Sequence, residues 1–173
     1  TAHRRESFGD GFERICEALL RIAAMDGVQL VYPVHPNPNV TGPVRRNLGD
    51  HPNIHLIEPL DYVSFADLMR RAYLMLTDSG GVQEEAPSFG KPALVLRNKT
   101  ERPEAVEAGT STLVGVDVEK IVGTTEWLIR DEVEYQRRAR IHNPYGDGHA
   151  SERIGDFILS YLEEREAASV ALS

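Results

Sequence analysis

The segment Tyr73-Leu74-Met75-Leu76-Thr77-Asp78-Ser79-Gly80-Gly81-Val82-Gln83-Glu84-Glu85 decides the fold of this chain. Its first five residues form an apolar run of strand length, and the residues after the Gly-Gly pair begin a helix. A strand without polar alternation that leads directly into a helix is typical of a parallel sheet covered by helices on both faces.

The rest of the chain repeats this alternation. Apolar runs predict strands over residues 28–32, 54–57, 73–77, 93–96 and 112–114. Helical spacing predicts helices over residues 8–25, 40–48, 64–72, 82–88, 118–130, 132–140 and 151–167. Because right-handed crossovers connect such strands, we predict an α/β fold with a Rossmann-like, doubly wound parallel sheet.

Composition excludes several classes of protein. The chain has 173 residues, 41% of them hydrophobic and 27% charged, which suits one folded domain over residues 1–173. Its 27 acidic and 19 basic residues give a net charge of −8, which argues against a nucleic-acid partner. No apolar run reaches the roughly 20 residues of a membrane span, so no membrane partner is expected. A single cysteine, Cys16, suits a reducing compartment, and we expect a cytoplasmic protein.

The first residues of the chain are polar. The chain begins Thr1-Ala2-His3-Arg4-Arg5-Glu6, with no strand before this segment. We therefore expect that the first strand of the sheet and an N-terminal domain belong to a longer protein and are absent from this chain.

Ligands bind at the carboxyl ends of the strands in such sheets. The segments to inspect are therefore residues 33–39, 58–65, 78–85 and 97–104, together with residues 3–6 if a strand precedes them. Neither His3 nor His35 has a second ligand at metal-binding spacing, so no metal site is expected.

The turn at Ser79, Gly80 and Gly81 has the chemistry of a phosphate cradle. Two glycines let an anion approach the backbone, and a helix that begins here points its free N–H groups outward. Glu85, about a turn and a half later, can accept hydrogen bonds from a ribose diol. The alternative is an ordinary strand-to-helix turn with Ser79 as its N-cap. The turn is neither a Walker loop nor a dinucleotide G-x-G-x-x-G motif.

Other motifs carry both a functional and a structural interpretation. Residues 97–104 contain the cations Arg97, Lys99 and Arg102, which can neutralise a diphosphate or belong to a solvated loop whose charges cancel. Residues 142–148 are interpreted as a structural connector. We expect Trp127 to be buried, and the apolar stripe on the last helix to form core or interface; this stripe is Ile154, Phe157, Ile158 and Tyr161.

Five segments together resemble one family. They are residues 1–9 (with His3-Arg4-Arg5-Glu6), 32–38 (with His35-Pro36-Asn37-Pro38), 77–87, 100–104 and 142–148. In this order and spacing, they are similar to the C-terminal half of the non-hydrolysing UDP-N-acetylglucosamine 2-epimerases, over residues 1 to about 161. The resemblance implies a two-domain GT-B fold in which this half holds the UDP.

The resemblance also implies roles for individual residues. By it, Ser79, Gly80 and Gly81 meet the diphosphate, Glu85 the ribose, Arg102 the phosphate or sugar, and Phe65 lies at the uracil segment. It further places the catalytic His3 towards the substrate, and Arg4 and His35 at a second UDP-N-acetylglucosamine site that acts as an activator.

The implied reaction converts UDP-N-acetylglucosamine into UDP-N-acetylmannosamine by elimination and re-addition of UDP, without a cofactor. In the family this serves cell-surface polysaccharide synthesis and the enzyme is a homodimer. The carboxylates that transfer protons lie in the N-terminal domain, so we expect this chain alone to be inactive. A hydrolysing 2-epimerase, another GT-B UDP-sugar glycosyltransferase, and a non-catalytic UDP-sugar-binding fragment remain alternatives.

Overall fold

Helices and parallel strands alternate along the chain, as the sequence predicts. The structure is a computed structural model that describes residues 1–171, with side chains described through residue 165. Its elements are η1 (Arg5–Ser7), α1 (Asp10–Ala23), β1 (Leu30–Pro33), α2 (Pro38–Leu48), β2 (Ile54–Ile57), α3 (Tyr62–Arg71), β3 (Met75–Thr77), α4 (Gly80–Glu85), η2 (Ala86–Phe89), β4 (Ala93–Val95), α5 (Pro103–Ala108), β5 (Ser111–Leu113), α6 (Val118–Arg130), α7 (Glu132–Ala139) and α8 (Ala150–Ala171).

Local sequence explains where the helices begin and end. In α1, the predicted apolar stripe is buried along its whole length, from Phe12 to Ile22. The chain then turns at Gly27, whose φ of 74° suits glycine. The α6 helix begins where the Asp117 carboxylate accepts a hydrogen bond from the Lys120 N–H at 2.8 Å, which satisfies a free donor of the first turn.

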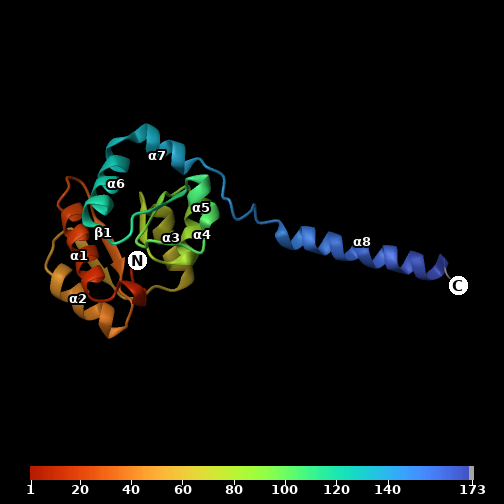
Figure 1. Ribbon diagram of the computed structural model, residues 1–173, viewed down its shortest axis with the longest axis horizontal. Helices are drawn as coiled ribbons and strands as arrows, with labels where there is room; N and C mark the ends of the chain where they lie inside the picture. The colour runs from red at the N-terminus through yellow and green to blue at the C-terminus, as the bar shows by residue number, and fades with distance from the viewer. Residues whose placement is uncertain (172–173) are drawn as a thin grey trace.

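The strands form two parallel sheets. β1 pairs with β2, and β3, β4 and β5 pair in that order, all in parallel. Side chains of β4 alternate between two hydrophobic clusters: Ala93 packs into one, and Leu94 packs into the other. The helices therefore cover both faces of the strands, and Figure 1 shows α1, α2 and α6 grouped apart from α3, α4 and α5.

The two sheets flank the first residues of the chain. The Thr1 amino group donates to the Leu76 carbonyl at 2.7 Å, and the Asp78 N–H donates to the Thr1 carbonyl at 3.1 Å. This is the bonding of a parallel strand residue opposite Thr77. On the other side, the Tyr32 hydroxyl donates to the Ala2 carbonyl at 2.6 Å. Thr1 and Ala2 thus lie at the carboxyl end of a strand position between β1 and β3.

Behind Thr1, a groove of about 750 Å³ runs between β1 and β3. Its walls are mainly apolar side chains, among them Leu30, Tyr32, Leu74 and Leu76. The backbone edges of β1 and β3 that would flank one more strand face each other across this groove.

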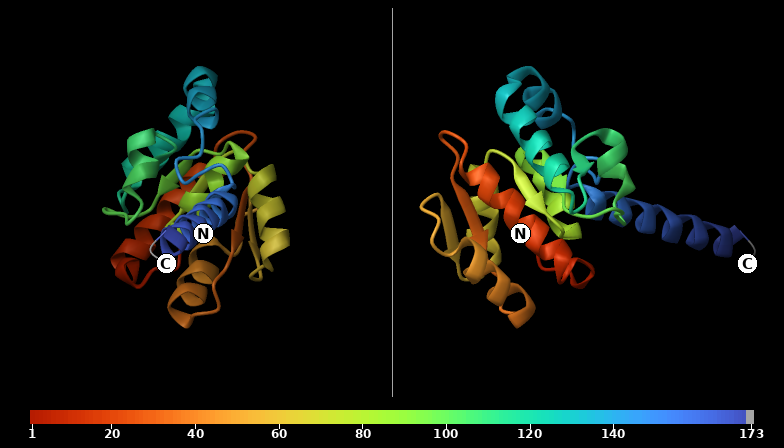
Figure 2. Two further views of the ribbon diagram at one scale, coloured as in Figure 1. Left: turned by 90° about the vertical axis from the view of Figure 1, so that its right-hand side faces the viewer. Right: turned by 60° about the vertical axis from the view of Figure 1, so that its left-hand side comes forward.

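The prediction that Trp127 is buried is wrong, and of the two alternatives predicted for the α8 stripe, core or interface, the core alternative is wrong. Trp127 is 45% exposed rather than buried, because the α6 face that carries it turns away from the core and lies under the Arg138 guanidinium at 5.3 Å. The stripe on α8, from Ile154 to Tyr161, is at least half exposed and forms no core, since α8 extends away from the domain (Figures 1 and 2). Within residues 1–171, no helix is both long and apolar enough to cross a bilayer.

Candidate functional site

The buried carboxylate of Asp78 joins two of the predicted segments at the carboxyl end of β3. Its Oδ2 atom accepts hydrogen bonds from the backbone N–H groups of His3 and Arg4, at 2.6 and 2.7 Å. Asp78 is fully buried, so this anchor is held away from competing water. The opening segment is therefore brought to the same edge as the glycine turn.

His3 and His35 meet at this edge from different segments. Their rings are stacked with centroids 5.3 Å apart and an interplanar angle of 13°. The side chain of His3 is 35% exposed, and burial is the main cause that lowers its pKa from the ordinary value. Arg4 follows directly and is half-buried. The structure thus gathers His3, Arg4 and His35, which the sequence singled out separately.

The glycine turn lies under a guanidinium group. A Cβ atom added at Gly80 would be 3.7 Å from the Nη2 atom of Arg102, so Arg102 lies across the turn. Ser79 occupies the N-cap position of α4, but its side chain makes no capping hydrogen bond. The Ser79 hydroxyl therefore does not cap α4, as the structural alternative would require.

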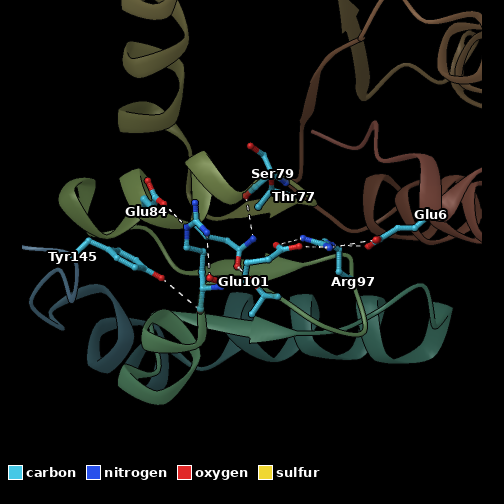
Figure 3. A network of polar contacts seen from close by, with 10 residues as sticks. Glu6, Thr77, Ser79, Glu84, Arg97, Glu101 and Tyr145 are labelled. Carbon is cyan, nitrogen blue, oxygen red and sulfur yellow. Dashed lines mark hydrogen bonds and ion pairs between the residues drawn. The ribbon is translucent and has the colours of Figure 1, made fainter.

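Arg102 is connected to the turn by a chain of hydrogen bonds (Figure 3). The buried Gln83 amide donates to the Ser79 carbonyl at 3.1 Å and accepts from the Thr100 hydroxyl at 2.6 Å. The Thr100 hydroxyl accepts in turn a hydrogen bond from the backbone N–H of Arg102 at 3.1 Å. The guanidinium itself pairs with Glu84, which raises the pKa of Arg102. These bonds set the position of the cation relative to the glycines.

Arg97, the other arginine of this loop, is used differently. It is only 7% exposed and binds Glu6 at 2.6 and 3.3 Å and Glu101 at 2.6 and 2.9 Å. Hydrogen bonds from Arg97 are the main cause that lowers the pKa of Glu101 to about 2. Arg97 therefore ties the loop after β4 to the opening segment, as Figure 3 shows for its contacts with Glu6 and Glu101. Arg102 is the cation that faces the glycine turn.

The segment 142–148 holds the neighbouring elements together, as its interpretation as a connector predicts. The Asn143 amide donates to the Glu84 carbonyl at 3.3 Å and to the Ser88 hydroxyl at 2.7 Å. The Tyr145 hydroxyl accepts from the Ala105 N–H at 3.2 Å. This segment therefore contacts both α4 and the start of α5.

Two predicted site residues lie further from the glycine turn. Glu85 is the last residue of α4 and is half-buried. Phe65, on α3, packs beside the cluster of Met69, Met75 and Val82 and lines the groove between β1 and β3. Among the described residues, no group of three or more His, Cys, Asp and Glu side chains is placed to hold a metal ion.

The sequence motifs assign no roles to Asp78, Gln83 and Glu84. All three belong to the segment that decides the fold, and Asp78 stands directly after its strand. That position marked Asp78 as a candidate, but the sequence contains no signal for which neighbours it would bind.

A parallel α/β domain with a glycine turn and a fixed guanidinium at its carboxyl edge is typical of domains that bind phosphate-containing ligands. The family model for UDP-N-acetylglucosamine 2-epimerase matches residues 1–159. The chain is 59% identical over 162 residues to the UDP-N-acetylglucosamine 2-epimerase of Salmonella typhimurium, which covers 93% of this chain and 43% of that relative.

Solved structures agree with this match. The chain is similar to the UDP-GlcNAc 2-epimerase of Neisseria meningitidis bound to UDP-GlcNAc, with a TM-score of 0.87 and 47% identity over 92% of this chain and 43% of that one. It is similar to the S. aureus MnaA–UDP complex, with a TM-score of 0.87 and 50% identity over 94% of this chain and 45% of that one. The chain belongs to the UDP-N-acetylglucosamine 2-epimerase family and has its fold, which confirms the predicted resemblance. It spans less than half the length of these relatives.

Proposed function

We propose that this chain is the UDP-binding part of a non-hydrolysing UDP-N-acetylglucosamine 2-epimerase. The observation that carries the proposal is the Arg102 guanidinium lying across the Ser79-Gly80-Gly81 turn. Family membership supports the proposal. The solved structures of two relatives, 47% and 50% identical to this chain, are complexes with UDP-GlcNAc and with UDP, respectively.

The diphosphate is proposed to lie on the glycine turn, against Ser79, Gly80 and Gly81. Gly81 is exposed, and a Cβ atom there would meet only the Ser79 hydroxyl at 3.8 Å, so an anion can approach this backbone closely. Arg102 supplies a planar fork of donors that suits phosphate oxygens. The two features come from different strand ends, and the Gln83–Thr100 bonds align them.

The remaining assignments rest on the family relationship. Glu85 is proposed to bind the ribose hydroxyls, Phe65 to lie near the uracil, and His3 to face the reacting sugar. Arg4 and His35 are proposed to line a second, activating UDP-N-acetylglucosamine site. The stacking of His35 on His3 supports a location of this second site next to the first.

The proposed reaction is a reversible elimination. A base removes the C2 proton while the C1–O bond breaks and the electron pair leaves with UDP, which gives a 2-acetamidoglucal. Reprotonation of C2 from the other face and re-addition of UDP at C1 give UDP-N-acetylmannosamine. Donors at the glycine turn and Arg102 stabilise the charge of the leaving diphosphate. The proton-transferring carboxylates are proposed to lie in an N-terminal domain, so residues 1–173 alone would be inactive.

Placement in a longer, cytoplasmic and homodimeric enzyme is part of the same proposal. The groove between β1 and β3 supports the placement in a longer chain, because Thr1 already makes the bonds of a parallel strand residue at the end of this groove. We propose that a strand joined to Thr1 fills the groove and merges the two sheets into one doubly wound sheet.

Calorimetry with UDP tests the proposed site. Gly81→Asp places a carboxylate beside the diphosphate, and repulsion at about 4 Å costs about 1–4 kcal/mol, so the affinity should fall at least about fivefold. Gly42→Asp is the matched control, because Gly42 is also an exposed helix glycine with open space around it and lies on α2. Equal UDP affinity for both variants would remove the diphosphate from this turn.

A further inference from the structure

One carboxylate oxygen of Asp78 is buried without a hydrogen-bond partner. The Oδ2 atom accepts the two backbone N–H groups of His3 and Arg4, while Oδ1 accepts no hydrogen bond from the described residues. An unsatisfied buried oxygen is costly, by roughly 1–3 kcal/mol, so its surroundings require an explanation. The nearest side-chain nitrogen to which the structure relates this atom is Nδ1 of His3, at 3.4 Å.

The His3 ring is held in this orientation by two contacts. Its own backbone N–H is bound to Asp78, so ring and carboxylate belong to one local unit. The His35 ring is stacked on one face and leaves both ring nitrogens of His3 free to bond in their own plane. A small closure of the 3.4 Å distance would give Oδ1 the partner it lacks.

The charge state of His3 favours a neutral ring. Burial lowers its pKa, as do His35, Arg4 and the Thr1 amino group, while Asp78 acts in the opposite direction. A neutral imidazole carries one proton, on either Nδ1 or Nε2, and the hydrogen bond at one nitrogen decides which.

We propose that Asp78 is a positioning residue that holds the His3 proton on Nδ1 and leaves the Nε2 lone pair free. Nε2 then lies on the side of the ring away from the buried carboxylate, and the His3 side chain as a whole is 35% exposed. Resting on the proposed function, this makes His3 a hydrogen-bond acceptor or a base towards the sugar rather than a donor.

His35 provides the contrast within the same stack. Its Nδ1 atom accepts a hydrogen bond from the Asn37 N–H at 3.2 Å, so its proton belongs on Nε2. His51 is bonded in the same way by the Asn53 N–H at 3.2 Å. The inference therefore requires stacked His3 and His35 to have opposite tautomers.

Nitrogen NMR of the chain, with ¹⁵N-labelled histidine rings, tests this at about pH 8, above the ordinary histidine pKa of about 6.5. His3 should show a protonated Nδ1, whereas His35 and His51 should show a protonated Nε2. Signals are assigned with His3→Gln and His35→Gln.

Asp78→Asn is the decisive variant. The amide oxygen can still accept the two backbone N–H groups, but its NH₂ group donates towards His3 Nδ1, so the proton should move to Nε2 of His3 alone. Unchanged His35 and His51 signals show that the variant is folded. A protonated Nε2 on His3 of the original chain overturns the proposal even if Asp78→Asn does not fold, and so does an unchanged His3 in the folded variant. No substrate is used, so this outcome is separate from the UDP calorimetry.

Discussion

Replacing Arg97 by methionine should destabilise the folded chain by about 2 kcal/mol. The guanidinium is 7% exposed and makes four charge-assisted hydrogen bonds, whereas its partners Glu6 and Glu101 are 52% and 60% exposed. Breaking a fully buried pair costs about 3–5 kcal/mol, and an exposed pair contributes about 0–1 kcal/mol. The Arg97 contacts lie between these limits. After the substitution, water can hydrate the Glu6 and Glu101 carboxylates, but it cannot reach the buried space that the guanidinium occupied.

Urea unfolding followed by circular dichroism measures this loss, and a thermal scan should show a decrease in Tm of about 4–8 °C. Arg21→Met is the matched control, since Arg21 also binds one carboxylate, Glu119, in a two-bond fork but is 41% exposed beside a partner that is 79% exposed. The control should lose much less stability than Arg97→Met, because both members of its ion pair are exposed. Equal losses for the two variants would refute the argument that burial of Arg97 sets its contribution.

Two further outcomes are expected. Glu85→Gln should weaken UDP more than dUDP in calorimetry, with the exposed Glu107→Gln on α5 as control, and equal losses would make Glu85 structural. A chain that ends at His149 should keep its Tm within about 2 °C, because α8 extends away from the domain; a larger decrease would show that α8 packs onto it.

Most of the fold could be predicted because strand and helix signals are local. Apolar runs identified all five strands, and α6 has the predicted bounds of residues 118–130. The prediction that Trp127 is buried was wrong for a physical reason. Helical spacing shows which side chains share a face of α6. Only the packing of α6 against α1 and α7 decides which edge of that face stays exposed to solvent. Trp127 lies on this exposed edge, under the Arg138 guanidinium.

The strand-end rule predicted which segments meet at one edge of the sheet, but not which side chains pair there. The strand-end rule selected the segments that carry His3, His35, Ser79 and Arg102, and the structure brings them to one edge. Which carboxylate binds which arginine depends on contacts between residues up to 91 positions apart, as for Arg97 and Glu6. Sequence spacing contains no information about such contacts, and Asp78 therefore remained without a role until the backbone N–H groups that it binds were known.

The two arginines of the loop after β4 show how burial separates structure from binding. Arg97 is held by two carboxylates and is almost closed off from water, so a ligand cannot reach it without displacing the loop. The Arg102 guanidinium pairs with Glu84 and donates to the Glu101 carbonyl at 3.1 Å, and the two side chains of the ion pair are 35% and 39% exposed. An exposed pair of this kind is weak, so in the proposed complex the diphosphate replaces Glu84 as the partner of Arg102. The Thr100 and Gln83 bonds already hold the backbone of Arg102 in place, which would position the cation before such a ligand arrives.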